Sequence, residues 1–78
     1  MRDAVAYLAR ALVDEPERVS VAELRTGRGV TYEVRAAEGD VGKLIGRGGR
    51  TVKALRKVVK ALAPAGRRVE VEVLAEGE

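Results

Sequence analysis

Residues Asp40 to Lys60 read DVGKLIGRGGRTVKALRKVVK and predict a short helix, a glycine loop and a long helix. Asp40 is a suitable helix N-cap, because its carboxylate can accept hydrogen bonds from the free N–H groups of the next turn. Gly46 suits the left-handed position that closes a helix. Three of the four residues from 46 to 49 are glycine, so a bulky ligand could approach the backbone closely.

The glycine loop, residues 46–49, has the features of a phosphate-binding site. The N–H groups at the start of a helix carry partial positive charge and attract anions. Arg47 and Arg50 add full charges on either side of the loop. A bare G-x-x-G is a weak signal, since glycine is common wherever two helices meet, and a plain joint between helices is the alternative. In this context we interpret the loop as a device for holding a sugar-phosphate backbone.

The net charge of +3 conceals a separation of charge along the chain. The segment from Val41 to Val69 contains nine basic side chains and no acidic one. The rest of the chain holds six basic and twelve acidic residues. A solvated helix face usually mixes both signs, so this segregation is typical of a polyanion-binding site.

The composition excludes several functional classes. The chain lacks cysteine, so it has no disulfide and no thiol nucleophile. It also lacks histidine, which is both the commonest general base and the commonest metal ligand. The remaining acids and bases show no convergent pattern, and no Walker or G-x-G-x-x-G loop is present. We therefore expect a non-catalytic protein with no metal and no cofactor.

The length and hydropathy indicate one small domain over residues 1–78. No apolar run approaches the roughly 20 residues that span a bilayer, and no signal peptide opens the chain. We therefore expect no membrane association and a cytoplasmic location.

The hydrophobic pattern predicts a further helix and a hairpin before the glycine loop. Asp3 can cap a helix that runs to about Val13, with a stripe at helical spacing and Tyr7 packed at its edge. Strands follow over Val19–Arg25 and Val30–Ala36, joined by a glycine-rich turn. In the first helix, which precedes these strands, the apolar stripe consists of Val5, Leu8 and Leu12.

The second of these strands alternates regularly, with Val30, Tyr32 and Val34 on one face. Tyr32 could stack on a base, but we interpret it as a core residue with its hydroxyl at the rim. Near the C-terminus, three valines that alternate with glutamate from Val69 to Val73 predict a third strand. We expect the acidic tail from Ala75 to Glu78 to fray.

The long helix from Arg50 to about Ala63 has two faces. Four apolar residues form the predicted buried stripe, namely Val52, Leu55, Val59 and Leu62. The opposite face is basic and carries Arg50, Lys53, Arg56, Lys57 and Lys60. Ala54 and Ala61 lie near the boundary, where small side chains allow another helix to approach closely.

The segment VGKLIGRGGRTVKAL resembles the loop of KH domains, in which an apolar residue and Ile precede Gly, Lys or Arg, any residue, Gly, and Arg or Lys. With LVDEPERVSV before it and GRRVEVEV after it, nearly the whole chain is similar to bacterial single-domain KH proteins of the KhpA (YlqC-like) family. Two residues depart from the usual loop, Arg47 in place of Lys and Gly48 in place of the frequent Gln. The resemblance implies an α+β fold of the type II KH-like order α-β-β-α-α-β, a three-stranded sheet covered on one face by three helices.

The resemblance also implies a site for about four nucleotides of single-stranded RNA. The residues that would hold the phosphates are Gly46, Arg47, Gly48 and Gly49. Those that would border the same backbone track are Lys43, Arg50 and Lys53. Those that would form either an apolar groove floor or the core beneath it are Val41, Leu44, Ile45 and Val34.

Members of this family are thought to act as RNA chaperones or post-transcriptional regulators. The resemblance thus implies a homodimer, or a heterodimer with a KhpB (Jag/EloR) type KH protein, and a link to cell elongation and cell-wall homeostasis. Two alternatives remain open, a protein-interaction module or a ribosome-associated assembly module, each docking a partner through the basic helix.

Overall fold

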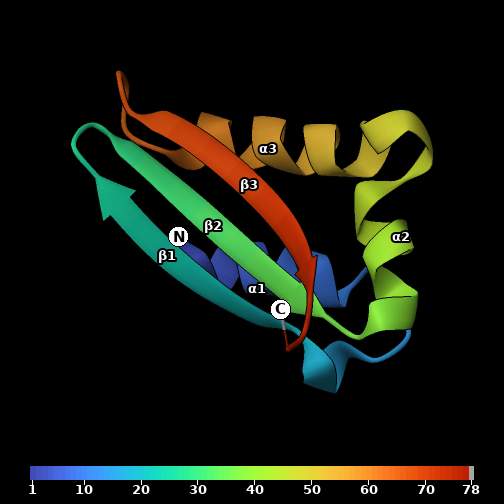
Figure 1. Cartoon of the computed structure of the whole chain (residues 1–78). Helices are drawn as coiled ribbons and strands as arrows, with labels where there is room; N and C mark the ends of the chain where they lie inside the picture. The colour runs from blue at the N-terminus through green and yellow to red at the C-terminus, as the bar shows by residue number, and fades with distance from the viewer. Residues whose placement is uncertain (78) are drawn as a thin grey trace.

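The chain folds in the predicted order α-β-β-α-α-β, as the computed structural model of residues 1–77 shows (Figure 1). The helices and strands are α1 (Arg2–Arg10), β1 (Ser20–Thr26), β2 (Gly29–Ala36), α2 (Val41–Ile45), α3 (Arg50–Leu62) and β3 (Arg68–Ala75). Three 3-10 turns connect them: η1 (Pro16–Arg18), η2 (Glu38–Asp40) and η3 (Arg47–Gly49).

The three strands form one mixed sheet in the order β1-β2-β3. β1 and β2 are an antiparallel hairpin in which Val21 pairs with Val34, and β3 runs parallel to β2. Buried and half-buried residues alternate along β2, and Tyr32 is 3% exposed. The predicted hairpin and the core position of Tyr32 are thus confirmed.

The core lies between the buried face of β2 and the helices. Its fully buried side chains include Val5 of α1, Leu44 of α2 and Val59 of α3, packed around Val34 of β2. Figure 1 shows α1 behind the sheet and α3 along its β3 side. The predicted α+β, type II KH-like arrangement, with three helices on one face of the sheet, is confirmed.

The first helix is shorter than predicted. It ends at Arg10 rather than near Val13, and Asp3 lies within its first turn instead of capping it. Beyond the helix, the backbone N–H groups of Asp14 and Glu15 donate hydrogen bonds to the carboxylate of Asp40. Of the predicted stripe Leu12 is 45% exposed, and Tyr7, expected to pack, is 75% exposed.

The buried stripe of α3 is narrower than predicted. Leu55 and Val59 are buried and Val52 is half-buried, but Leu62 is 59% exposed. Val58 is also exposed. A chain of this size forms a thin core that covers little of each helix, so the exposed apolar side chains Leu12, Val58 and Leu62 remain on the surface.

The beginning of the acidic tail is ordered, contrary to the expectation that it frays. The N–H of Glu76 donates to the carbonyl of Ala36 at 2.8 Å, and the Glu76 carboxylate pairs with Arg18. The first bond continues the pairing of β2 with β3 to Glu76, and the ion pair joins the tail to η1. Glu78 lies outside the described residues. No helix within residues 1–77 is long and apolar enough to cross a bilayer.

Candidate nucleic-acid interface

The glycine loop joins α2 to α3 through three residues with positive φ. Gly46 has φ 75° and ψ 170°, a region that essentially only glycine adopts. Gly48 and Gly49 have φ 63° and 81° with ψ near zero, in the left-handed helical region. The left-handed helical conformation predicted for Gly46 is therefore wrong for that residue, and Gly48 and Gly49 adopt it instead.

The three glycines differ in how much space surrounds them. A Cβ on Gly46 would lie 2.3 Å from the Oγ1 atom and 2.7 Å from the backbone nitrogen of Thr51. A Cβ on Gly48 would have no atom within 4 Å. Gly46 is therefore required for the close contact between α2 and α3, while Gly48 lies at an open tip that a ligand can approach.

The loop uses some of its own backbone donors. The N–H of Gly49 donates to the carbonyl of Gly46 at 3.1 Å, and the N–H of Arg50 donates to the carbonyl of Arg47. These bonds close the 3-10 turn and use two N–H groups that sequence analysis expected to be free for a phosphate. A phosphate at this loop would therefore meet the exposed tip, Arg47 and Gly48.

Three of the predicted basic residues surround this tip without a counter-charge. Arg47, Arg50 and Lys53 are exposed, and within residues 1–77 none of them forms an ion pair. The structure thus gathers Arg47, Arg50 and Lys53 near Gly48 at one end of α3. Their positive charge is available to an external anion.

Lys43 differs from these three cations. Its ammonium group pairs with Asp14 and lies 3.7 Å from an Asp40 carboxylate oxygen. The hydrogen bond to Asp14, aided by the charge of both carboxylates, raises the pKa of Lys43 against the effect of desolvation. Asp14 lies far away in the sequence, so its neutralising position could not be foreseen from the spacing.

Asp40 does not cap α2 through its side chain. It is 3% exposed, and its carboxylate accepts hydrogen bonds from the N–H groups of Asp14 at 3.2 Å and Glu15 at 3.0 Å. Burial alone would raise the pKa of Asp40, but these two bonds and the charge of Lys43 outweigh it and hold the pKa below its ordinary value. Asp40 thus anchors the start of α2 to the segment after α1, a role that sequence analysis missed.

The four apolar candidates divide into two pairs. Leu44 and Val34 are fully buried and belong to the core. Val41 is half-buried and Ile45 is 37% exposed. Val41 and Ile45 are therefore the members of this set that can contact a ligand beside the loop.

α3 extends the basic surface away from the loop. Lys53, Lys57 and Lys60 are exposed along the helix, and Arg56 lies 4.0 Å from Glu70 of β3. On the other side of α3 a hollow of about 350 Å³ has a mostly apolar lining from α3, the end of α1 and the residues just after it, which includes Leu12 and Val58, together with Arg50 and Thr51. α3 thus exposes a basic face and an apolar face. Residues 1–77 contain no cluster of three metal-ligating side chains.

Similar folds occur in solved structures of Era. An Aquifex aeolicus Era variant bound to GDP.AlF4- matches with a TM-score of 0.61 and 20% identity, over 95% of this chain and 29% of that one. A structure of Era in complex with MgGDPNP and nucleotides 1506-1542 of 16S ribosomal RNA matches with a TM-score of 0.64, also at 20% identity and with the same coverage. The chain spans less than a third of these proteins, so the likeness shows the fold alone.

Closer relatives are similar over most or nearly all of their length. A protein from Chlamydia trachomatis named "RNA-binding protein KhpA" is 38% identical over 97% of this chain and 99% of the relative. The protein of the same name from Mycobacterium tuberculosis is 48% identical over 88% of this chain and 86% of the relative. This name is that of a binding protein, and it confirms the prediction that the chain is not an enzyme.

The match of a family model agrees with these relatives. The model described as "KhpA/KhpB, KH domain" matches residues 2–73, which include both the hairpin and the glycine loop. The resemblance seen in the sequence is therefore confirmed, and the chain belongs to the KhpA/KhpB family of KH domains.

Proposed function

We propose that the protein binds single-stranded RNA through the glycine loop and catalyses no reaction. The observation that supports this most directly is the open tip at Gly48, where even an added Cβ would meet no atom within 4 Å. This tip lies between Arg47 and Arg50, two exposed cations without an ion pair within residues 1–77. The similar proteins are named RNA-binding proteins, and one structure of Era contains ribosomal RNA. A phosphate can reach the backbone at this tip and meet two guanidinium groups.

The residues of the loop have different roles in this proposal. Gly46 sets the path of the chain, and Arg47, Gly48 and Gly49 contact the phosphates. Arg50 and Lys53 attract the same backbone track from the first turns of α3, and the half-buried or exposed Val41 and Ile45 offer apolar contact to a base. Lys43 contributes less than the other cations, because two carboxylates already share its charge.

In the cell, such a protein fits the role of an RNA chaperone or post-transcriptional regulator in the cytoplasm. The family resemblance extends this proposal to a link with cell elongation and cell-wall homeostasis. It also includes a heterodimer in which a KH protein of the KhpB (Jag/EloR) type is the second subunit. The chain would act as a single KH domain in each of these roles.

Pairing of two copies is supported by the exposed apolar surface formed by Leu12, Val58 and Leu62. A single groove gains from pairing, because a second linked groove raises the effective concentration of the site. We therefore propose a homodimer at micromolar concentration. Sedimentation that gives only a species of 8.4 kDa in that range would contradict it.

A protein-interaction module, or one associated with ribosome assembly, is the second candidate function. It is favoured by the fact that α3 exposes a basic and an apolar face together, as a helix that docks a partner does. In that case short RNA without a protein partner would not bind.

A titration of binding against salt tests the RNA proposal. With four to six phosphate contacts, log K for single-stranded RNA falls against log salt with a slope of roughly −3 to −4. We expect affinity to be micromolar or weaker, since the chain has no Phe or Trp to stack on bases. Fluorescence anisotropy with labelled single-stranded and duplex RNA measures both quantities. Binding that ignores salt, or that prefers the duplex, would refute the proposal.

A further inference from the structure

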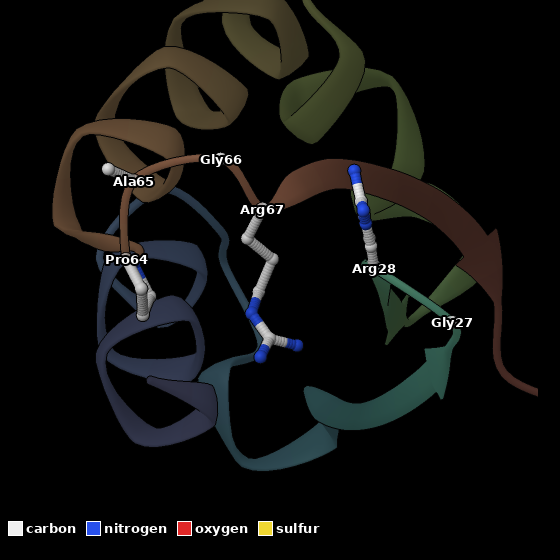
Figure 2. A pocket seen from close by; sticks show the side chains of 6 residues that line it. All are labelled: Gly27, Arg28, Pro64, Ala65, Gly66 and Arg67. Atoms are coloured by element: carbon white, nitrogen blue, oxygen red, sulfur yellow. The ribbon is translucent and has the colours of Figure 1, made fainter.

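A second basic site lies at the end of α3 opposite the glycine loop. Two turns meet there, the Gly27-Arg28 turn of the β1–β2 hairpin and the turn from Pro64 to Arg67 between α3 and β3 (Figure 2). Between them is an open hollow of about 400 Å³, lined by Gly27, Arg28, Pro64, Ala65, Gly66 and Arg67.

Backbone hydrogen bonds hold the two turns together. The N–H of Arg68 donates to the carbonyl of Arg28 at 3.1 Å, which extends the pairing of β2 with β3 by one residue. The N–H of Arg67 donates to the carbonyl of Pro64 at 3.2 Å and closes the second turn. Arg28 and Arg67 are therefore attached to one hydrogen-bonded junction, from which their side chains extend in opposite directions (Figure 2).

Neither arginine of this junction has an acidic partner within residues 1–77. On the sheet and η1, by contrast, arginines pair with glutamates, as Arg25 does with Glu23 at 2.6 Å. Arg28 is exposed and Arg67 is half-buried. Burial and the Glu23 carboxylate raise the pKa of the Tyr32 hydroxyl, and the charges of Arg25 and Arg67 oppose this rise, so the Arg67 side chain lies near Tyr32.

The small residues of the hollow leave room for a tetrahedral anion. Gly27, Ala65 and Gly66 have little or no side chain, and a Cβ on either glycine would have no atom within 4 Å. Guanidinium groups bind phosphate with two parallel hydrogen bonds, so Arg28 and Arg67 can each hold a phosphate of one strand. Among residues 1–77, the lining contains no acidic residue that would repel it.

The basic surface is continuous from this hollow back to the loop. A neighbouring hollow of about 590 Å³ shares Gly66 and Arg67 and adds Arg56, Lys60 and Arg68, with Glu70 as its one acidic residue. Lys53 and Lys57 continue the exposed charge along α3. The 13 residues of α3 span about 20 Å, so the two ends can contact different phosphates of one strand.

We propose that Arg28 and Arg67 form a second phosphate-binding site, the far-end site, which takes the backbone of the same single-stranded RNA beyond the segment held by the glycine loop. This inference rests on the proposed RNA-binding function. It assigns the protein a footprint longer than the about four nucleotides that a KH loop grips.

The test compares oligouridines of about four and about twelve nucleotides, labelled with fluorescein, by anisotropy. The variant Arg28→Gln with Arg67→Gln removes both charges of the far-end site. The control Arg10→Gln with Arg18→Gln removes the same charge from α1 and η1, where both side chains already have partners. All three proteins are first checked for an unchanged circular dichroism spectrum.

We expect the far-end variant to bind the longer RNA at least about tenfold more weakly, because charge-assisted hydrogen bonds are lost. Its salt slope should become shallower by about 1.4, since each phosphate contact to a single strand contributes about 0.7. Binding of the short RNA should match that of the control. If the far-end variant matches the control on the longer RNA, or loses both RNAs equally, the far-end site is refuted while RNA binding by the parent stands. If the parent binds neither RNA, the proposed function itself fails.

Discussion

The two turns at the ends of α3 have similar residues but lie at opposite poles of the helix dipole. Each places an arginine beside a glycine of positive φ, Arg47 with Gly48 at one end and Arg67 with Gly66 at the other. The glycine loop lies at the start of the helix, where the macrodipole is positive and attracts anions, and the far end lies where it is negative. Backbone and side chains thus act together at the loop, whereas the far end depends on guanidinium groups alone.

The ends also differ in how tightly the backbone is packed. Gly46 lies against Thr51, and the buried carboxylate of Asp40 fixes the start of α2. At the far end a Cβ on Gly66 would meet nothing, and the junction is held by the bond from Arg68 to Arg28. The loop end is therefore the more specialised structure, and substitutions of the same kind should have larger effects there.

Charge reversal is the largest expected effect. Arg47→Asp with Gly48→Asp changes the charge at the tip by three units, and binding of both short and long RNA should fall below detection because phosphates are repelled at close range. The fold should persist, since both residues are exposed and contact little. Anisotropy measures the affinity and circular dichroism checks the fold.

The matched variant Gly66→Asp with Arg67→Asp makes the same change at the far end. It should weaken binding of the longer RNA and leave the short RNA bound. A control at Arg2 and Arg10 on α1 should leave binding nearly intact. A folded loop variant that binds RNA like the parent would show that the loop is not the site, although the KH fold would remain.

Packing of the two turns provides the second comparison. Gly46→Ala combines backbone strain with overlap against Thr51, so we expect a loss of stability of roughly 2–6 kcal/mol. Gly66 has a φ of 85° but open space around it, so Gly66→Ala should lower the stability by no more than about 2 kcal/mol. Urea denaturation followed by circular dichroism measures both. Equal losses would mean that Thr51 moves aside and that the loop end is no more tightly built than the far end.

Sequence analysis predicted much of this structure because local signals determine it. The alternation in β2 placed Tyr32 in the core, and the glycines marked the hairpin and the start of α3. Helical periodicity showed which side of α3 faces inward, but not how wide the covered stripe is. That width depends on neighbouring elements, so Leu62 was wrongly assigned to the core.

The candidate site was predictable to a similar degree. The basic residues of the loop are adjacent in sequence, and the structure places Arg47, Arg50 and Lys53 together at its exposed end. The pairing of Lys43 with Asp14, and the backbone bond from Arg68 to Arg28 that joins the two turns, depend on contacts between distant segments. No local spacing reveals such contacts, so they required the structure.

Acid sensitivity distinguishes the two ends with the smallest expected effect. The pKa of Asp40 is lowered in the folded protein. The contribution of Asp40 to folding stability is therefore complete above the ordinary pKa of 3.8, and it is lost as the pH falls from there through the folded pKa. Asp40→Asn should lower the stability at neutral pH, because the amide cannot accept both N–H groups of Asp14 and Glu15. The difference between parent and variant should shrink in acid.

The matched control Glu38→Gln changes an exposed carboxyl of the same turn and should show no such dependence. Hydrogen exchange of the amides in α2 and in the Arg28–Arg68 junction locates the effect: only α2 should open more readily in acid, because the bond at the junction contains no titratable group. An undiminished difference in acid, or equal opening at both ends, would contradict the role given to Asp40.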